Sequence, residues 1–354
     1  MDATNAASRA AQMGKMTPTG NFNMEGSGVK SYSGSYGVGI GVPLNNGGAN
    51  QSSLGLGASV SQNFGASNGY RYSTKPDFGV DFPPLDATWQ KEAKTVVGSD
   101  QISEPGGIFI DRHNTLFIAD QYNYRILKLE YGSVKTTLVM DGLNYPDDLV
   151  IDSEGTMFIA EKESLTRWPK GARSGTVLGR AQWLLSVALD SKEEYLYVTD
   201  YMTSYVMKYS AKGGAEQNGT IVIPDTYEPW SVAVDENGAI YVAKFDGNVV
   251  KWKKNESGKG KIVVDQLGEP RGISVDSHGT LYIANCGGNS IVRVLAGSKN
   301  ATIIAAGNGI GDAPNQLYNP DDLAFDSYGN LYVSDYGNSR VQMFKINIKS
   351  SSNS

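Results

Sequence analysis

One phrase, repeated six times, constrains the fold of this 354-residue chain more than any other feature. In each copy an apolar strand ends in Asp, a short polar turn follows, and a second apolar strand ends in a polar residue. The copies recur at spacings of roughly 40 to 50 residues, a period typical of repeated units with four short strands. The strand-ending aspartates are Asp111, Asp152, Asp190, Asp235, Asp276 and Asp326. We interpret all six as structural residues, because Asp commonly accepts hydrogen bonds from the backbone of its own turn.

Every copy continues with a third strand, and five of the six continue with a fourth, β-branched one. The sixth copy has no fourth strand after it, but Thr95, Val96 and Val97 supply such a strand ahead of the first copy. An N-terminal strand that completes the last sheet would close a ring and leave no free edge at the seam. The sequence therefore predicts an all-β, six-bladed β-propeller over residues 94–348, closed by its N-terminal strand.

The repeats resemble those of the NHL family, whose signature phrases are P-x-G-[IV]-x-[VI]-D and [LI]-Y-[VI]-[AS]-[DN]. Matching phrases include RGISVDSHGTLYIAN from Arg271 and DDLAFDSYGNLYVSD from Asp321. The resemblance covers residues 94–348 and implies a six-bladed propeller. It leaves the function open, since similar propellers include metal-dependent amidating lyases, gluconolactonase-like enzymes and many modules that only bind proteins, RNA or glycans.

The sequence offers no set of catalytic residues that we would assign. The two histidines, His113 and His278, both fall in the turn between the first and second strands of a copy, where a channel metal could not be reached. The single cysteine, Cys286, has no evident base to activate it. We predict no catalytic residue, no metal site and no cofactor, with calcium as the one ion left open.

Carboxylates at the start of the first strands are the best candidates for a ligand site. The second and sixth copies both read Pro-Asp-Asp-Leu here, at what should be one mouth of the central channel. Such oxygen atoms could bind Ca²⁺, or a sugar stacked on a tryptophan. In the alternative interpretation one Asp of each pair caps its turn and the other pairs with Arg271. The candidates are Asp147, Asp148, Trp230, Arg271, Asp321 and Asp322.

The segment before the repeats has a different composition, rich in Gly and Ser, and it alternates in two stretches. Large residues share one face, small ones the other, and a turn-rich sequence separates the stretches, which indicates a β-hairpin arm over residues 29–66. The apolar face is formed by Tyr32, Tyr36, Val38, Ile40, Val42, Leu54, Leu56, Val60 and Phe64. An isolated hairpin is marginally stable, so this face favours strand addition to a neighbouring chain. The alternative is a disordered low-complexity tail.

The remaining parts are predicted to be a flexible N-terminal segment over residues 1–28, a Pro-containing linker over 67–93 and a tail over 349–354. A net charge of −6 and a pI near 5.1 argue against nucleic-acid binding, and no apolar run is long enough to span a membrane. Four N-glycosylation sequons favour an extracellular or cell-surface setting over the cytoplasm. They are Asn50, Asn218, Asn255 and Asn300.

These observations favour a non-enzymatic propeller that assembles with itself through its arm, as a filament-like or surface structure. Two alternatives stay open. One is a ligand-binding protein, lectin or Ca-dependent enzyme that uses the channel mouth and takes glycans as partners. The other is an intracellular protein-interaction propeller.

Overall fold

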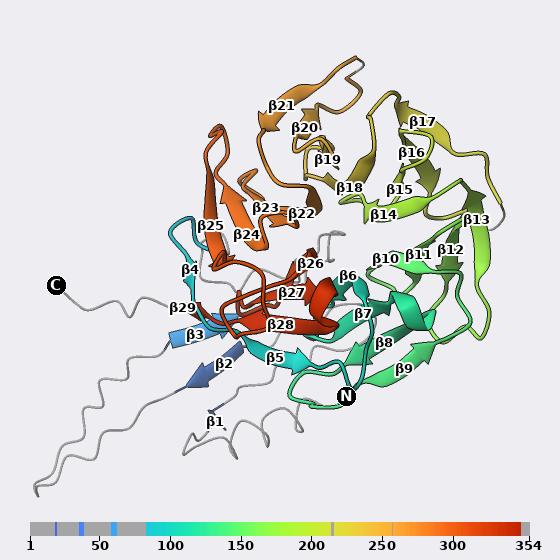
Figure 1. Ribbon diagram of the computed structural model, residues 1–354. Helices are drawn as coiled ribbons and strands as arrows, with labels where there is room; N and C mark the ends of the chain where they lie inside the picture. The colour runs from blue at the N-terminus through green and yellow to red at the C-terminus, as the bar shows by residue number, and fades with distance from the viewer. Residues whose placement is uncertain are drawn as a thin grey trace, which may run out of the picture. The chain divides into compact units, whose positions relative to one another are not determined.

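The computed structural model describes residues 83–347, except residues 214, 215 and 257, together with the backbone of three short strands nearer the N-terminus. Six antiparallel four-stranded sheets, the blades, surround a common centre, as the sequence predicted (Figure 1). The strand that begins each blade lies nearest the centre, and the fourth strand lies at the rim.

The blades are numbered in chain order. Blade 1 holds β6 (Pro105–Ile110), β7 (Leu116–Asp120), β8 (Arg125–Leu129) and β9 (Thr137–Met140), and blade 2 holds β10 (Pro146–Ile151), β11 (Met157–Glu161), β12 (Ser164–Trp168) and β13 (Thr176–Arg180). Blade 3 holds β14 (Leu184–Leu189), β15 (Tyr195–Asp200), β16 (Tyr205–Ser210) and β17 (Thr220–Ile223), and blade 4 holds β18 (Pro229–Val234), β19 (Ile240–Lys244), β20 (Val249–Trp252) and β21 (Lys261–Val264). Blade 5 holds β22 (Pro270–Val275), β23 (Leu281–Asn285), β24 (Ser290–Val294) and β25 (Ala301–Ala306). Blade 6 holds β26 (Pro320–Phe325), β27 (Leu331–Asp335) and β28 (Arg340–Phe344), and the short 3-10 helices η1 (Gln121–Asn123) and η2 (Tyr336–Asn338) follow β7 and β27.

Burial falls from the centre of the ring to its rim. All six residues of β6 are buried, whereas β9 has no buried residue. The inner strands are covered by a neighbouring blade on each side, so a continuous apolar run suits them better than an alternating one. The hydrophobic cores accordingly lie between blades, where for example Tyr209 of blade 3 packs in one cluster with Leu178 of blade 2.

The six strand-ending aspartates all hold the turn that follows them, as predicted. Asp111 accepts hydrogen bonds from the backbone N–H groups of His113 at 2.8 Å and Thr115 at 2.9 Å. The same pair of bonds, from the second and fourth residues after the Asp, recurs at Asp152, Asp235, Asp276 and Asp326. Asp190 accepts instead from the backbone N–H groups of Glu194 and Tyr195, the fourth and fifth residues after it. The motif in the sequence is thus a turn motif, repeated because every blade needs the same tight connection.

The ring closes at blade 6 with a strand from the other end of the propeller, which confirms the predicted role of Thr95, Val96 and Val97. Strand β5 (Lys94–Val97) pairs antiparallel with β28 and takes the place of a fourth strand. The Thr95 hydroxyl also donates to Oε1 of Gln342 at 2.8 Å. No edge of the six blades is left open at this seam.

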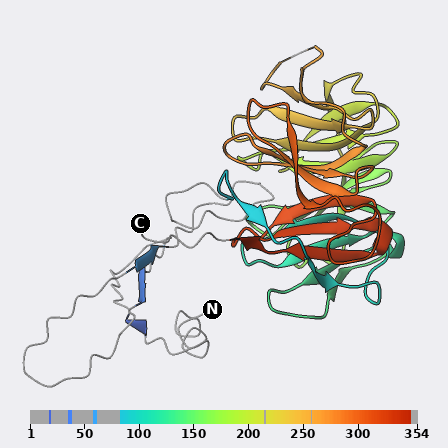
Figure 2. The ribbon, with the colours of Figure 1, turned by 60° about the vertical axis from the view of Figure 1, so that its left-hand side comes forward.

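A short segment ahead of β5 packs into the propeller, which differs from the extended connector expected for residues 67–93. Strand β4 (Thr88–Trp89) pairs with β29 (Ile346–Asn347), which follows blade 6, and the views in Figures 1 and 2 place β4 beside β25 of blade 5. The Trp89 ring is 4% exposed and packs in one cluster with residues of blades 5 and 6. Periodicity did not reveal this segment because it is only two residues long.

The arm contains a small sheet of its own. Strands β2 (Ser35–Val38) and β3 (Ala58–Ser61) pair antiparallel, with Tyr36 opposite Val60, and β1 (Pro18–Thr19) pairs with the other edge of β2. The antiparallel pairing of β2 with β3 is of the kind predicted for the hairpin, and β1 is an additional strand. The predictions for Tyr32, Ile40, Val42, Leu54, Leu56, Phe64 and Asn50 fall outside the described residues.

Candidate functional site

The predicted mouth residues do meet at the axis of the ring, at the end where the first strands begin. Asp147, Asp148, Trp230, Asp321 and Asp322 line one small void there, of about 10 Å³. A void of this size holds one water molecule at most. Arg271 does not line it but approaches it from the side, through its contacts with two of these residues.

The second aspartate of each pair binds backbone rather than a ligand. Oδ2 of Asp148 accepts hydrogen bonds from Val187 N at 3.0 Å and from the Ser186 hydroxyl at 2.9 Å, both in the next blade. Oδ2 of Asp322 likewise accepts from Ile108 N of blade 1 at 2.8 Å. Both carboxylates are buried, and each joins two blades near the axis. This is close to the structural alternative, except that the bonds cross between blades instead of capping a turn.

Glycines make room for these carboxylates. A Cβ atom on Gly107 would lie 2.3 Å from Oδ1 of Asp148, and one on Gly272 would lie 2.2 Å from Oδ1 of Asp322. Either contact is too short for a real side chain. Blades 1 and 5 therefore carry Gly where the following blade carries its inter-blade Asp.

The first aspartates have different partners in the two blades. Asp321 forms a salt bridge with Arg271, with 2.8 Å between Oδ1 and Nη1, and the guanidinium stacks over the Trp230 ring at 4.3 Å from its centroid. The alternative interpretation thus holds for blade 6. It is wrong for blade 2, where Asp147 accepts a hydrogen bond from the Gln121 amide instead.

Asp147 is a perturbed acid at this mouth. Its carboxyl is buried, and its Oδ2 has no hydrogen-bond partner within the described structure, although the indole of Trp183 approaches it. Burial raises the pKa of Asp147 well above its ordinary value, and the nearby charges of Asp321 and Asp148 raise it further. A carboxyl that stays protonated at neutral pH can donate a hydrogen bond to a ligand, which a charged one cannot.

The residues set aside in the sequence take the places expected of them. His113 and His278 lie in the turns after Asp111 and Asp276. Cys286 is buried, and burial raises the pKa of its thiol to about 11, so the reactive thiolate is disfavoured. Across the described ranges no three His, Cys, Asp or Glu side chains are grouped so that they could hold a metal ion, and no helix there is long and apolar enough to cross a membrane.

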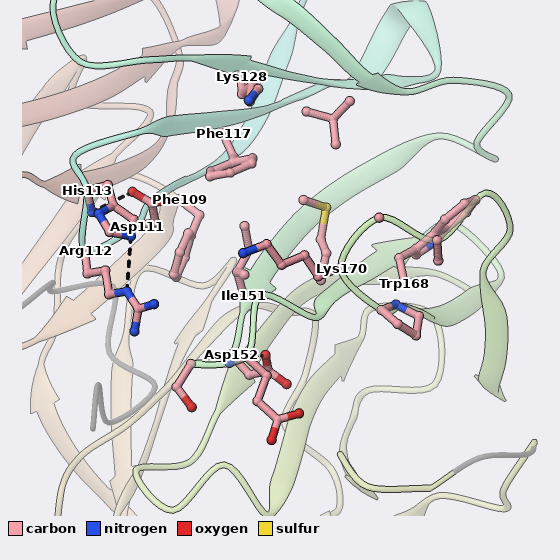
Figure 3. Close-up of a pocket in the computed structure, with 18 of the residues that line it drawn as sticks. Phe109, Asp111, Arg112, His113, Phe117, Lys128, Ile151, Asp152, Trp168 and Lys170 are labelled. Atoms are coloured by element: carbon pink, nitrogen blue, oxygen red, sulfur yellow. Dashed lines mark hydrogen bonds between the residues drawn. The ribbon is translucent and has the colours of Figure 1, made fainter. Parts of the chain in front are cut away.

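A larger opening lies elsewhere and was missed by sequence reasoning. A cleft of about 370 Å³ opens between blades 1 and 2, among the turns at the opposite end of the blades from the first-strand starts. Figure 3 shows the rings of Phe109 and Phe117 on one side of the cleft, with Lys170 reaching in from the other toward Ile151. Its volume is in the range typical of small-molecule sites.

A departure from the repeat explains part of this opening. At the position of Phe117, blades 3 to 6 carry tyrosine, as in Tyr241 and Tyr332. The hydroxyl groups of these two tyrosines reach Oδ2 of the turn aspartates Asp235 and Asp326, at 3.3 Å in both cases. Phenylalanine cannot make that bond, so the space beside Asp111 is not filled in the same way. Comparing the copies position by position separates the phenylalanines of blades 1 and 2, Phe117 and Phe158, from the tyrosines of the other four blades.

Three sequons lie where glycans would meet solvent. Asn218, Asn255 and Asn300 are all exposed and precede the outer strands β17, β21 and β25. Their placement agrees with the rim position expected from the sequence. Glycosylation itself stays a prediction.

A six-bladed β-propeller with a plugged axis and a side cleft is the class that this geometry defines. Solved structures of the same fold include a gluconolactonase from Xanthomonas campestris (TM-score 0.57, 14% identity, covering 76% of this chain and 97% of that one). Others are virginiamycin B lyase from Staphylococcus aureus (0.53, 12%, covering 73% and 99%) and the calcium-binding protein regucalcin from Agrobacterium tumefaciens (0.57, 13%, covering 74% and 95%). At these identities the likeness establishes the fold alone.

A family model for the NHL repeat matches residues 317–344, the sixth copy. Together with the six blades this shows that the chain is an NHL-repeat β-propeller. No curated protein matches the chain by sequence.

Proposed function

We propose that this NHL propeller is a non-enzymatic structural and interaction module that assembles with itself through its N-terminal arm. In this hypothesis the arm adds a strand to a neighbouring subunit and builds a filament-like or surface assembly. The observation that carries the proposal is the arm's own small sheet, β1–β2–β3, formed by the segments that alternate in the sequence. Within the described strands its edges, β1 and β3, each have a single partner, and an open edge can pair with another chain.

Features of the propeller support the assignment of self-assembly to the arm. Strand β5 gives blade 6 a fourth strand like that of the other five blades, so β28 is not left as an unpaired edge. At its axis, two carboxylates are used to join blades and a third is paired with Arg271. The enzymes among the structural neighbours share no more than 14% identity with the chain, so their activities give no reason to assign catalysis here.

The extracellular setting is part of the same proposal and rests on the exposed sequons. Glycans on Asn218, Asn255 and Asn300 would extend from the rim without disturbing any blade core. Treating the protein from its native source with a glycosidase and weighing it by mass spectrometry tests this part. An unchanged mass would favour the intracellular alternative.

Self-assembly is tested on the full chain with a charged pair in the arm. Tyr36 and Val60 are cross-strand partners, so Tyr36→Asp with Val60→Asp places two like charges opposite each other on the apolar face. Ser133→Asp with Thr137→Asp is the matched control, because it adds two charges at exposed residues of the propeller. Light scattering after size exclusion should show an oligomer for the parent chain and the control, and a monomer for the arm variant. A monomeric parent chain would refute the proposal.

A second candidate function rests on Asp147. Its carboxyl, whose pKa is raised by burial, lies at the same void as Trp230 and Asp321, and the hydroxyl of a sugar is the kind of small group that this mouth would take. Calorimetry with Ca²⁺ and with simple glycans tests it, with Asp147→Asn as the variant that should reduce the heat of a glycan. No heat with either ligand would leave this candidate without support.

A further inference from the structure

The cleft between blades 1 and 2 has a filled counterpart in the same molecule. Between blades 5 and 6, the equivalent space holds Trp89, delivered by the short strand β4. The Trp89 ring lies edge-on to Tyr282 of blade 5, with 6.2 Å between centroids, and 5.8 Å from Phe325 of blade 6. The space between blades 5 and 6 thus contains an indole, and the equivalent space between blades 1 and 2 is open.

The two spaces correspond residue by residue in the repeat. Phe117 takes the position of Tyr282, and Ile151 takes the position of Phe325. The third residue after the turn aspartate is glycine in both, Gly155 in blade 2 and Gly329 in blade 6. The open cleft therefore has the same kind of walls as the one that already accepts an indole.

The polar contacts of the filled space also have counterparts. The Trp89 indole N–H donates to the carbonyl oxygen of Gly329 at 2.8 Å, and Arg293 donates to the carbonyl oxygen of Ala87 at 2.9 Å. Gly155 and Lys128, both lining the open cleft, occupy these two positions in blades 2 and 1. An indole N–H would meet the Gly155 backbone, and an oxygen a few bonds away would meet Lys128, whose amine also pairs with the exposed Glu130 at 2.9 Å.

The open cleft carries cations that the filled space lacks: Arg112 stands where blade 5 has Ser277, and Lys170 is the second. Where Ile346 lines the filled space, the open cleft has Lys170, which forms no ion pair with any described residue. Figure 3 shows its amine directed into the cleft, beside Ile151. Three carboxylates line the cleft with it: Asp111 and Asp152 already accept backbone N–H bonds from their own turns, and Glu154 is exposed. The cation therefore suits an oxygen acceptor on the ligand, above all a carboxylate.

We propose that the cleft between blades 1 and 2 binds an indole group that carries a carbonyl or carboxylate oxygen. Two sources have this chemistry, a small indole acid and a tryptophan residue on a partner peptide. The inference is independent of assembly through the arm, since it rests on the walls of two blades only.

The experiment uses the full chain and two probes, a fluorinated indoleacetate and N-acetyltryptophanamide, with binding followed by fluorine NMR for the first and by calorimetry for both. Val139→Trp on the outer strand β9 fills the cleft, and Leu138→Trp, at the exposed neighbouring residue that does not line it, is the control. Lys170→Met removes the cation. Its control is Lys254→Met, because Lys254 lies against Gly238 in blade 4 as Lys170 lies against Gly155 in blade 2.

We expect the parent chain and both controls to bind at least one probe, and Val139→Trp to lose that binding. Lys170→Met should weaken indoleacetate binding by on the order of tenfold, the usual worth of a charge-assisted hydrogen bond. Binding of indoleacetate alone points to a small acid, whereas binding of the amide points to a peptide-borne tryptophan. Failure of the parent chain to bind either probe, or equal binding by Val139→Trp, overturns the proposal.

Discussion

At the scale of single residues, the two Asp-Asp pairs divide their roles. The second aspartate of each pair joins two blades, and the first either pairs with Arg271, as Asp321 does, or is buried with a raised pKa, as Asp147 is. The motif alone could not separate these roles, because both copies read Pro-Asp-Asp-Leu and the difference lies in what the neighbouring blades present. Gln121 faces Asp147, whereas Arg271 faces Asp321.

Removing an inter-blade carboxylate should cost stability. Asp322→Ala leaves the buried Ile108 N–H without its acceptor, so the free energy of unfolding should fall by about 1–3 kcal/mol. Asp141→Ala, at an exposed residue, should change it by no more than about 0.5 kcal/mol. Urea unfolding of the three proteins checks this. Equal midpoints for all three would mean that the bond between blades 6 and 1 carries no net stability.

The raised pKa of Asp147 predicts how the stability of the fold depends on pH. Because its folded pKa is raised, the folded state keeps this proton in a pH range where the unfolded state has lost it. The contribution of Asp147 to stability is therefore full below the ordinary Asp pKa and falls as pH rises toward the folded pKa. Asp147→Asn does not titrate, so its stability relative to the parent chain should increase between acid and neutral pH. Urea midpoints across this range measure the difference, and a constant difference would contradict the raised pKa.

At the scale of strands and turns, the sequence predicted the elements that recur in every blade and missed the features that differ between blades. Each blade's strands follow from short apolar and β-branched runs and from turn chemistry, so six copies reinforced the same prediction. The cleft depends on departures from the repeat, such as Phe117, and on contacts between blades, which no single copy contains. Trp89 was assigned to a linker because a two-residue strand has no periodicity, yet it is buried between two blades.

The equivalence of the two inter-blade spaces can be tested from the filled one. Trp89→Ala should lower the free energy of unfolding by about 3–5 kcal/mol, since it empties a buried aromatic site. Added indole should then raise the melting temperature by filling the cavity. Placing Val139→Trp in the same chain blocks the cleft between blades 1 and 2, so any remaining effect of indole belongs to the site of Trp89. A melting temperature that indole does not change would argue that this space is not an indole site by itself.

At the scale of the whole molecule, the seam at blade 6 differs from every other sheet. Five blades take their fourth strand from the chain that immediately follows, whereas blade 6 takes β5 from ahead of blade 1. The pairing of Val97 with Val341 thus links the two ends of the propeller directly. Closing a ring in this way couples all blades, because opening the seam frees both blade 6 and the start of blade 1.

Proline substitutions at two equivalent positions distinguish this coupling of blades through the seam from a purely local effect on one sheet. Thr95 lies opposite Gln342 in blade 6, and Leu138 lies opposite Leu127, the same register position in blade 1. Proline in either outer strand removes one backbone donor and disturbs one sheet edge to a similar degree. Thr95→Pro should nevertheless speed amide hydrogen exchange across β26, β27, β28 and the β6 strand of the next blade, whereas Leu138→Pro should affect β8 and β9 only. Mass-spectrometric exchange of the two variants and the parent chain measures this contrast. Equal, local effects of the two prolines would show that the seam contributes no more to the ring than any other outer strand does.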